Sequence, residues 1–513
     1  MSDKAALGID LGTTRSAMAH VTGGEPEVIM NSEGDGVTPS IVHLTADGES
    51  LVGEPAANQM LMEPDRTVRE VKKLMGENET VALGDEEFTP QDVSALVLQK
   101  LVDDAEDRLG REVTNAVITV PAYFTDRERT ATREAGEIAG LEVDKLLPEP
   151  SAAVLAYGLR EQQLGEATNE TVFVYDLGGG TFDATLVDAE YEYNYIETVA
   201  TDGDNELGGS NWTRRIEEHA YETIEEDVGV DVTENPEQRQ RINDAAKDAK
   251  HRLSDQQTAN LTVPFVVPEE NYNLDVEITR EQFEGMTEDL IDRTRAPMDD
   301  ILERTDYAVE DVDKVLLIGG STRMPQVEAL VTDYFDMEPS KEISPDRAVA
   351  LGAAVQASII SDDAETAPLP SGDESDEAGG LVLIDVLPQS IGVKVQPGNR
   401  FDPVVEQDAQ LPTSERKEGY SVRHADQTSV AIEVYQGEAE EAHDNEFLGK
   451  AVLDDIPPRD PGQQSLAVEF TVNADGTLEV HGEDLLSDKA VSAEIESALE
   501  TDSRDEEQLP PNA

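Results

Sequence analysis

The segment Val172-Phe-Val-Tyr-Asp-Leu-Gly-Gly-Gly-Thr-Phe-Asp183 carries the strongest fold signal in this sequence. Its apolar run 172–175 predicts a buried strand, and 184–187 predicts the strand that returns from the turn. Three successive glycines leave backbone N–H groups unshielded, so an anion can approach them closely. Asp176 and Asp183 flank the turn, which makes sense if a metal ion lies between them and a bound phosphate. The alternative is a glycine-rich hairpin with two solvated aspartates.

Two further segments repeat this plan. Ala6-Leu-Gly-Ile-Asp-Leu-Gly-Thr-Thr14 has an apolar strand, an aspartate, a glycine and two hydroxyl residues in the same order. Val315-Leu-Leu-Ile-Gly-Gly-Ser-Thr-Arg323 places a third glycine turn after another apolar run. Because an internal duplication is a strong architectural signal, the first two turns predict two related lobes that face one nucleotide from either side.

Length and composition narrow the class of protein. The 513 residues suffice for two or three domains with complete cores, and the absence of cysteine excludes disulfides and thiolate metal sites. No apolar run has the length needed to span a bilayer, and the first residues lack the pattern of a signal peptide. We therefore expect a soluble, cytoplasmic and monomeric protein without membrane partners.

The formal net charge is −74. Such a charge opposes binding to nucleic acid or to an anionic membrane through a general field. The acids are spread through every segment while the apolar patterns of strands and helices persist, which a disordered acidic chain would lack. Because salt at about 1 M screens charge repulsion within about 3 Å, the composition favours a fold adapted to a halophilic, archaeal-like cytoplasm.

Residues 1–361 show α/β patterning. Residues 67–76 predict a short helix with Lys72 and Lys73, of which Lys73 is interpreted as a solvated surface residue and Lys72 as either structural or functional. Glu149 lies between two prolines before a predicted helix, where it either orients a water or only favours the helix dipole. Further helices are expected at 90–109, 125–139, 151–158, 212–228, 236–253, 280–305, 325–335 and 345–360, the last with small residues for close packing, and further strands at 115–120, 259–267 and 273–278.

The composition changes at Ser361. Residues 362–380 are acidic, contain proline and glycine and have few large apolar side chains, which predicts a flexible linker. An isolated apolar patch at 381–384 is either a docking patch or the first strand of the next domain. Short alternating runs predict that this next domain is an all-β sandwich, with strands at 391–395, 420–422, 430–435, 466–472 and 478–481. Residues 491–513 are expected to be a disordered or short helical tail.

Six segments, in this order and spacing, resemble the DnaK-type 70-kDa heat-shock chaperones. They are 8–14, 118–124, 149–153 with 156–159, 175–183, 319–325 and 385–392. The resemblance implies an actin-like ATPase domain of two α/β lobes over 1–361, a linker over 362–384 and a peptide-binding β-sandwich over 385–490. It further implies a stress-response chaperone that hydrolyses ATP to ADP to control the binding and release of unfolded or extended polypeptides. A J-domain co-chaperone and a nucleotide-exchange factor are the implied partners.

The resemblance also assigns site residues by position. Lys72 is expected to stabilise the transferred phosphoryl group and Glu149 to help position the attacking water, with Asp176 and Thr181 completing the catalytic set. Mg²⁺ is expected near Asp10 and Asp176, and K⁺ near Asp10 and Asp183. The expected ATP or ADP contacts are Gly12, Thr13, Thr14, Gly178, Gly179, Gly180, Thr181, Gly208, Gly209, Lys250, Ser254, Gly319, Gly320, Arg323 and Asp346. The expected peptide contacts are Val393, Gln396, Arg423, Val430 and Ile432.

Several positions depart from the family pattern. Lys247 stands on the expected adenosine side, where the family usually has an acid, and Gln396 and Arg423 replace apolar or small residues that arch over bound peptide. The chain is also expected to stop where the helical lid of the family would begin. These departures leave open an ATP-gated regulatory or binding module with one specific partner. A small-molecule kinase on the same fold is a third interpretation, without a substrate-pocket signature.

The charge analysis predicts salt-dependent stability. We expect the melting temperature to rise substantially between about 0.1 M and about 3 M KCl, because the Debye length falls from about 10 Å to below about 3 Å and repulsion among the acids is screened. Thermal unfolding followed by circular dichroism measures this. An unchanged melting temperature over that range would contradict adaptation to salt.

Overall fold

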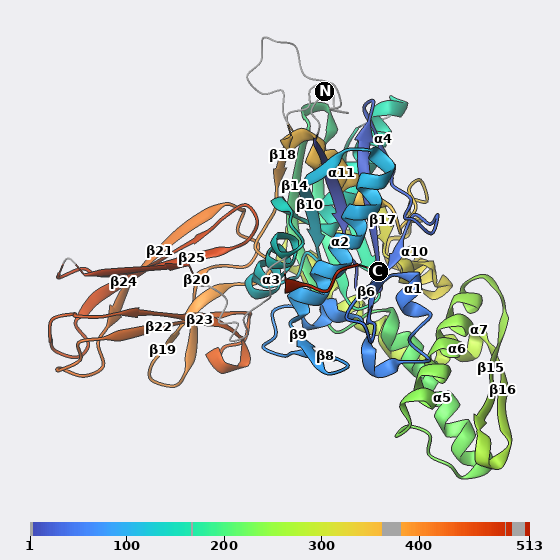
Figure 1. The fold of residues 1–513 in the computed structure, drawn as a ribbon. Helices are drawn as coiled ribbons and strands as arrows, with labels where there is room; N and C mark the ends of the chain where they lie inside the picture. The colour runs from blue at the N-terminus through green and yellow to red at the C-terminus, as the bar shows by residue number, and fades with distance from the viewer. Residues whose placement is uncertain (1–3, 166–167, 362–380, 488, 495–507, 513) are drawn as a thin grey trace.

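The computed structural model describes residues 4–165, 168–361, 381–487, 489–494 and 508–512. The expected linker residues 362–380 lie outside this set. Figure 1 shows two large sheets at the centre of the molecule and a separate pair of sheets to one side. Within the described residues, no helix has both the length and the apolar character that crossing a membrane demands.

The first large sheet has six strands of mixed direction. Strand β1 (Lys4–Asp10) pairs in parallel with β10 (Glu112–Val120) and antiparallel with β2 (Arg15–Thr22). Helices cover both faces of β1 and β10, which explains why these two strands are nearly continuous apolar runs. The other members are β11 (Glu142–Pro148), β3 (Glu25–Val28) and β4 (Thr38–Pro39).

The second large sheet repeats the arrangement. Strand β12 (Asn169–Leu177) pairs antiparallel with β13 (Phe182–Glu190) and in parallel with β17 (Lys314–Ile318). The order continues from β13 to β14 (Tyr195–Asp204) and β18 (Val382–Ile384). Each sheet therefore contains one hairpin with a parallel neighbour, and the two Asp-Leu-Gly turns occupy corresponding positions. The strand predictions for both turns are confirmed.

Two helices with small side chains pack closely on each other and on the first sheet. Helices α4 (Glu149–Leu164) and α11 (Ala348–Ile360) share one buried apolar cluster. A Cβ atom on Gly352 would lie 1.7 Å from the carbonyl oxygen of Ala152, and one on Gly8 would lie 2.0 Å from the nitrogen of Ala354. The small residues predicted for close packing in the last helix are thus required there.

The remaining elements up to residue 361 cover the outer faces of the sheets. Figure 1 shows a separate helical layer with a β-hairpin at one end of the molecule. The longer helices are α2 (Pro90–Leu109), α3 (Asp126–Ile138), α5 (Gly209–Val228), α6 (Pro236–Asp255) and α10 (Pro325–Phe335). The hairpin is β15 (Thr258–Val267) and β16 (Tyr272–Thr279). Smaller elements are β5 (Ile41–Leu44), β6 (Ser50–Val52), α1 (Glu54–Ala57), β7 (Thr67–Arg69), β8 (Val81–Leu83) and β9 (Glu86–Phe88).

The helix predicted at 67–76 is wrong. Strand β7 occupies its first three residues, Glu70 adopts a left-handed conformation at φ 57°, and a short 3-10 helix, Val71–Leu74, comes next. The reason is sheet pairing, since β-branched Val68 pairs with Val42 of β5. A local helical pattern cannot report such a partner.

The single helix predicted at 280–305 is three helices. They are α7 (Arg280–Met286), α8 (Glu288–Arg293) and α9 (Arg295–Arg304). At the two breaks the threonine hydroxyls donate back to carbonyl oxygens, Thr287 to Phe283 at 2.9 Å and Thr294 to Ile291 at 2.7 Å. Such local bonds compete with the helix, and each break therefore has a threonine at it.

Residues 385–494 form two facing four-stranded sheets with one shared core. The first sheet has the order β20 (Arg400–Val405), β19 (Ile391–Val395), β22 (Val430–Gln436), β23 (Glu446–Leu453). The second has the order β21 (Thr413–Ser421), β24 (Gln464–Val472), β25 (Leu478–Asp484), β26 (Ala490–Glu494). The sequence did not predict β20 or β23, because proline or charged residues interrupt their alternation, nor β26, which is short and has Val491 as its one large apolar residue.

The apolar patch at 381–384 belongs to the second large sheet. Its strand β18 pairs in parallel with β14, and Leu381 and Leu383 pack on the cluster of α4 and α11. The interpretation of this patch as the first strand of the sandwich is therefore wrong. The patch is docked on the edge strand β14 of the second large sheet.

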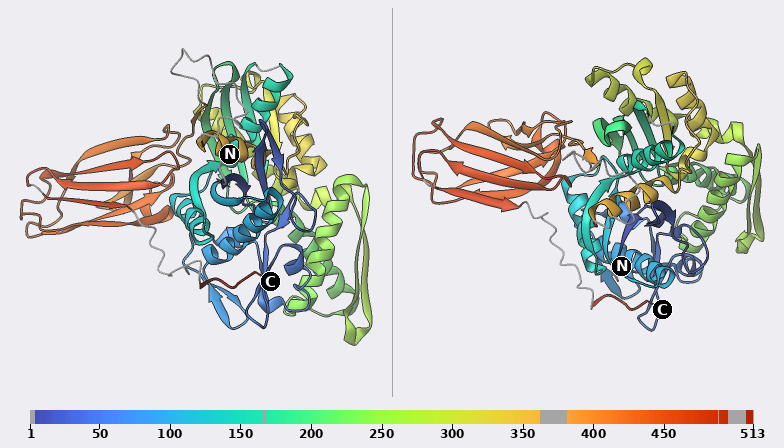
Figure 2. Two further views of the ribbon diagram at one scale, coloured as in Figure 1. Left: turned by 45° about the horizontal axis from the view of Figure 1, so that its top comes forward. Right: turned by 90° about the horizontal axis from the view of Figure 1, so that it is seen from above.

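Figure 2 shows the sandwich projecting from one side of the molecule. Side chains of α3 and α9 contact it. The backbone N–H of Leu478 donates to Oδ1 of buried Asp126 at 2.9 Å. Arg304 donates to Asp202 at 2.6 Å and to Asp408 of the sandwich at 2.7 Å, and so joins two carboxylates. Burial raises the pKa of Asp126 to about 7. These contacts between the sandwich and the rest of the chain are polar.

The final residues also differ from expectation. Residues 491–494 are part of β26, and 508–512 lie against β6 rather than forming a disordered or helical tail. The intervening residues 495–507 lie outside the described set.

Removal of the Arg304 guanidinium should weaken the docking of the sandwich. Arg304→Gln leaves two carboxylates facing each other, at a cost of about 1–3 kcal/mol to the docked state. We expect a larger radius of gyration by small-angle scattering in molar salt. The matched control is Arg295→Gln, in the same helix, whose ion pair is with neighbouring Asp292. An equal radius in both variants would contradict the role of Arg304.

Candidate functional site

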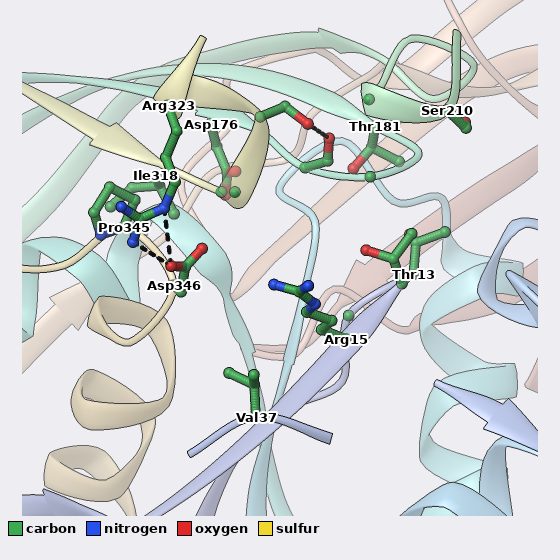
Figure 3. Close-up of a pocket in the computed structure, with 18 of the residues that line it drawn as sticks. Thr13, Arg15, Val37, Asp176, Thr181, Ser210, Ile318, Arg323, Pro345 and Asp346 are labelled. Atoms are coloured by element: carbon green, nitrogen blue, oxygen red, sulfur yellow. Dashed lines mark hydrogen bonds and ion pairs between the residues drawn. The ribbon is translucent and has the colours of Figure 1, made fainter. Parts of the chain in front are cut away.

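A cavity of about 480 Å³ opens between the turns of the two large sheets. The β1–β2 turn contributes Thr13 and Thr14, the β12–β13 turn contributes Gly178 and Thr181, and the turn after β17 contributes Gly319. Figure 3 shows Thr13 and Thr181 at one end, with Arg323, Asp346 and Pro345 at the other. The repeated glycine turns thus converge on one space.

Most of the residues that the sequence singled out line this cavity. Those that it brings together are Asp10, Gly12, Thr13, Thr14, Lys72, Glu149, Asp176, Gly178, Gly179, Thr181, Gly209, Lys250, Ser254, Gly319, Gly320, Arg323 and Asp346. Gly180, Gly208 and Asp183 lie behind this lining. Asp183 is buried and accepts a hydrogen bond from the backbone N–H of Tyr123 at 2.9 Å.

The central glycine turn is held by the start of α5. The backbone N–H of Gly209 donates to the Gly178 carbonyl at 3.0 Å, and that of Ser210 donates to the Gly179 carbonyl at 2.9 Å. A Cβ atom on Gly208 would lie 2.4 Å from the nitrogen of Gly180. Glycine is therefore needed at this crossing, and the first turn of α5 fixes the position of the glycine loop.

A buried ion pair lies at the glycine-turn end of the cavity. Lys72 Nζ donates to Glu149 Oε1 at 2.8 Å, and the Lys72 side chain is only 5% exposed. The ammonium also lies 5.3 Å from the centre of the Phe124 ring. Glu149 is the first residue of α4, fixed between Pro148 and Pro150. The ion pair, the burial of Lys72 and the two prolines around Glu149 thus hold both side chains in a fixed position.

Lys73 is solvent-exposed, as predicted, but it also has two partners in the fold. Its Nζ donates to Ser210 Oγ at 2.6 Å and forms an ion pair with Glu70 at 2.9 Å. The left-handed conformation of Glu70 directs this loop toward α5. Lys73 therefore connects the 3-10 helix to the start of α5, and the sequence pattern could not show this partner.

Three aspartates form a buried acidic cluster. Burial raises the pKa of Asp10 and of Asp183 to about 7, with the nearby Glu149 carboxylate as the next cause, and the same two causes raise that of Asp176 well above its ordinary value. Oδ2 of Asp176 has no hydrogen-bond partner among the described residues. Carboxylates in such a site favour a cation.

The acidic cluster fits a hydrated magnesium ion better than a fully protein-bound metal. Among the described residues no group of three or more His, Cys, Asp or Glu side chains could hold a metal by itself. Mg²⁺ keeps several waters and commonly uses one or two carboxylates together with substrate phosphates. The unpartnered oxygen of Asp176 and the adjacent anion turn match that donor set.

Sequence reasoning placed Lys247 on the adenosine side but missed the two arginines that form a basic wall of the cavity with it. Arg15 lines the cavity, and Figure 3 shows the guanidinium pointing into the space between the two ends. Arg69 donates to Asn243 Oδ1 at 2.6 Å, and Lys247 lies on the same wall. Neither Arg15 nor Lys247 forms an ion pair with any described residue. In a chain with 112 acids and 38 bases, this indicates an anionic ligand. The position of Arg15 directly after Thr13-Thr14 was the available signal.

The two basic residues predicted on the adenosine side, Arg323 and Lys250, form hydrogen bonds with neighbouring residues. Arg323 Nε donates to Asp346 Oδ2 at 3.1 Å. Lys250 is buried and donates to the Gly209 carbonyl at 2.6 Å, and burial together with the charge of Lys247 lowers its pKa to about 7. These contacts fix both side chains beside the cavity.

The five predicted peptide contacts lie in the sandwich and not at this cavity. Val393 and Ile432 are buried in the sandwich core, and Val430 is half-buried. Gln396 and Arg423 are exposed. The structure therefore places polar side chains at the two positions expected to arch over a peptide.

Paired Asp-Leu-Gly turns, a buried lysine–glutamate pair and a basic wall define a class of protein that binds a nucleotide through its phosphates. The protein-family match is to "Hsp70 protein" and covers residues 6–513. The chain belongs to the Hsp70 family.

Relatives agree with this assignment. "Chaperone protein DnaK" of Halobacterium salinarum is 45% identical, over 97% of this chain and 76% of the relative. "Chaperone protein DnaK" of Thermotoga maritima is 42% identical, over 95% of this chain and 79% of the relative. Both similarities run through the sheets and the sandwich.

The basic wall predicts weaker nucleotide binding when Arg15 is neutralised. We expect Arg15→Gln to raise the dissociation constant of ATP about tenfold in molar KCl, because a pair within a cavity is screened less than a surface pair. Isothermal titration measures this. The control is Arg214→Gln, an exposed arginine of α5 paired with Glu218 outside the cavity. Equal affinities would show that Arg15 does not contact the ligand.

Proposed function

We propose that this chain is an ATP-dependent molecular chaperone that hydrolyses ATP to ADP to control the binding and release of unfolded or extended polypeptides. The observation that carries the proposal is the cavity between two Asp-Leu-Gly turns with the Lys72–Glu149 pair at one end. The DnaK chaperones among the relatives support the same function.

The proposed architecture is an actin-like ATPase domain of two lobes followed by a peptide-binding sandwich. The shared strand plan of the two large sheets supports two related lobes. We place the ATPase domain at 1–361, the linker at 362–384 and the sandwich at 385–490, to which β26 adds residues up to 494.

In the proposed mechanism the turns at 12–14 and 178–181 hold the phosphates of ATP. Lys72 neutralises charge that develops on the transferred phosphoryl group, and Glu149 orients the attacking water at its carboxylate. Thr181 lines the γ-phosphate position. Phosphoryl transfer depends mainly on positioning and charge stabilisation, which a buried and preorganised pair supplies. The adenosine would lie toward Ser254, Gly320 and Arg323, beyond Arg15.

Two cations are part of the proposal. Asp10 and Asp176 would hold Mg²⁺ through water, and Asp10 and Asp183 would lie near K⁺. When bound, the magnesium ion supplies positive charge to the phosphate oxygens. The chain's own contribution is to keep these carboxylates buried and fixed, with Thr119 donating to Asp10 at 3.5 Å.

A short path of contacts is the proposed link between the ATP site and the sandwich. Ser151, two residues after Glu149 in α4, donates to Asp385 Oδ1 at 2.6 Å, and Thr198 of β14 donates to the same oxygen at 3.3 Å. Asp385 directly follows β18. A change at the first turn of α4 would therefore reach the docked patch and the sandwich beyond it.

The proposal also covers the cellular compartment of the protein and its partners. We propose unfolded or extended polypeptides as clients, a J-domain protein and a nucleotide-exchange factor as co-chaperones, and no nucleic acid partner. The charge of −74 supports a halophilic cytoplasm. We further propose that the protein is a monomer.

One alternative has support in the sandwich. Gln396 and Arg423 are exposed and polar where a general apolar peptide would be covered. A module that binds one specific partner under the control of ATP would suit these side chains.

The catalytic assignment predicts separate effects on turnover and binding. We expect Lys72→Ala to lower the ATP turnover number about 10²- to 10⁴-fold, because charge stabilisation in the transition state is lost. Nucleotide binding should persist, since the glycine turns remain. The control is Lys100→Ala, a lysine paired with Asp104 on α2 away from the cavity. Wild-type turnover in Lys72→Ala would refute the assigned chemistry.

Client stimulation distinguishes the two functions. For a general chaperone we expect a panel of unrelated apolar peptides to raise steady-state ATP turnover by at least about threefold, because bound peptide shifts the docking equilibrium of the sandwich. Colorimetric phosphate release measures this in molar KCl. Charged peptides of equal length are the control. No response to any peptide in the panel would favour the single-partner module.

A further inference from the structure

The segment 508–512 lies on a surface formed by β6 and α2, away from the sandwich. Figure 1 shows it in red beside β6 and α2, and Figure 2 shows it crossing the same face from two other directions. Strand β6 is an edge of the small sheet with order β6-β5-β7. We call the surface around Ser50 and Asp103 the β6–α2 site.

The backbone of the segment adds to the exposed edge of β6. The backbone N–H of Ser50 donates to the carbonyl of Pro511 at 2.8 Å, and Ser50 and Asn512 form a parallel bridge. The Ser50 hydroxyl donates to the Asn512 side-chain oxygen at 3.0 Å. Ser50 itself is buried, so these bonds satisfy polar groups that would otherwise have no partner at this edge.

Side chains of the segment add an apolar anchor and a polar one. Leu509 is 8% exposed and belongs to the buried cluster under the first large sheet. Pro510 is buried beside it. The Asn512 side chain donates from Nδ2 to Asp103 Oδ2 of α2 at 2.8 Å. The anchors lie at opposite ends of the segment and engage both elements of the site.

The residue types suit this mode of binding. Proline lacks a backbone N–H, so Pro510 and Pro511 only accept hydrogen bonds, and the backbone contact with Ser50 uses the Pro511 carbonyl. Successive prolines also favour an extended backbone, which lowers the entropy lost on binding. Strand addition by an extended peptide is a common recognition mode.

We propose that the β6–α2 site is a docking site for an extended Leu-Pro-Pro-Asn peptide, and that its occupation by residues 509–512 ties the sandwich to the ATPase core. This second tie is separate from the one through β18. It does not depend on the nucleotide chemistry proposed above.

The length of chain between β26 and the docked segment limits how far the sandwich can move. The 13 residues 495–507 join the end of β26 to the docked segment. Thirteen residues span at most about 45 Å when fully extended. A sandwich whose last strand is anchored in this way stays near its docking face, so its effective concentration there is raised. Release of 508–512 should therefore also loosen the docked strand β18.

Hydrogen exchange tests docking and coupling separately in the full chain. Leu509→Asp places a charge in the apolar anchor. We expect exchange of the Ser50 amide to accelerate at least about tenfold, and exchange of the Val382 amide of β18, which donates to the Asn194 carbonyl, about threefold. The matched control is Gln508→Asp, which adds the same charge at the exposed neighbouring position. It should leave both amides unchanged.

The two outcomes overturn different parts of the proposal. Unchanged exchange at Ser50 in Leu509→Asp would overturn the docking site. Faster exchange at Ser50 with unchanged exchange at Val382 would overturn the tie to the sandwich. ATP turnover plays no part in either readout, so failure here is distinguishable from failure of the proposed function.

Swapping the side-chain types of Asn512 and Asp103, which are both exposed, provides a second test. Asn512→Asp sets two carboxylates against each other at Asp103, and we expect faster exchange at Ser50. Combination with Asp103→Asn restores one donor and one acceptor and should restore slow exchange. If the double variant exchanges as fast as Asn512→Asp alone, the contact with α2 does not contribute to docking.

Discussion

The buried ion pair between Lys72 and Glu149 is the interaction on which the rest of this structure depends. The pair has little water to weaken it, and breaking it would leave one charge buried without a partner, at a cost of about 3–5 kcal/mol. Glu149 begins α4, and Ser151 in the same turn holds Asp385 beside the docked strand β18. The proposed chemistry at the cavity and the position of the sandwich thus depend on residues within one helical turn.

The cavity has a larger share of basic residues than the chain as a whole. The chain as a whole carries −74, while Arg15 and Lys247 face the cavity without an acidic partner among the described residues. An anion entering that space meets positive side chains without acidic partners on one wall, inside a negative molecule. The buried aspartates nearby have raised pKa values, which is the expected state of carboxylates that await a cation.

Local sequence patterns predicted the elements whose conformation is decided by neighbouring residues in the chain. Apolar runs before glycine turns predicted β1, β12 and β17, and α2 was predicted to its terminal residues. Failures came where a distant partner decides the conformation: β7 pairs with β5, and residues 508–512 with β6. The same limit explains Lys73 and Arg15, whose significance depends on what folds opposite them. Strand β23 was missed because charged residues interrupt its apolar alternation.

The most direct measurement of the central claim is the dissociation rate of a labelled apolar peptide from the intact chain, compared between ATP and ADP in molar KCl. We expect dissociation to be faster with ATP by at least about tenfold, since differences in affinity are expressed mainly in the off-rate. Equal rates with both nucleotides, in a preparation that hydrolyses ATP, would contradict control of the sandwich by the nucleotide cavity.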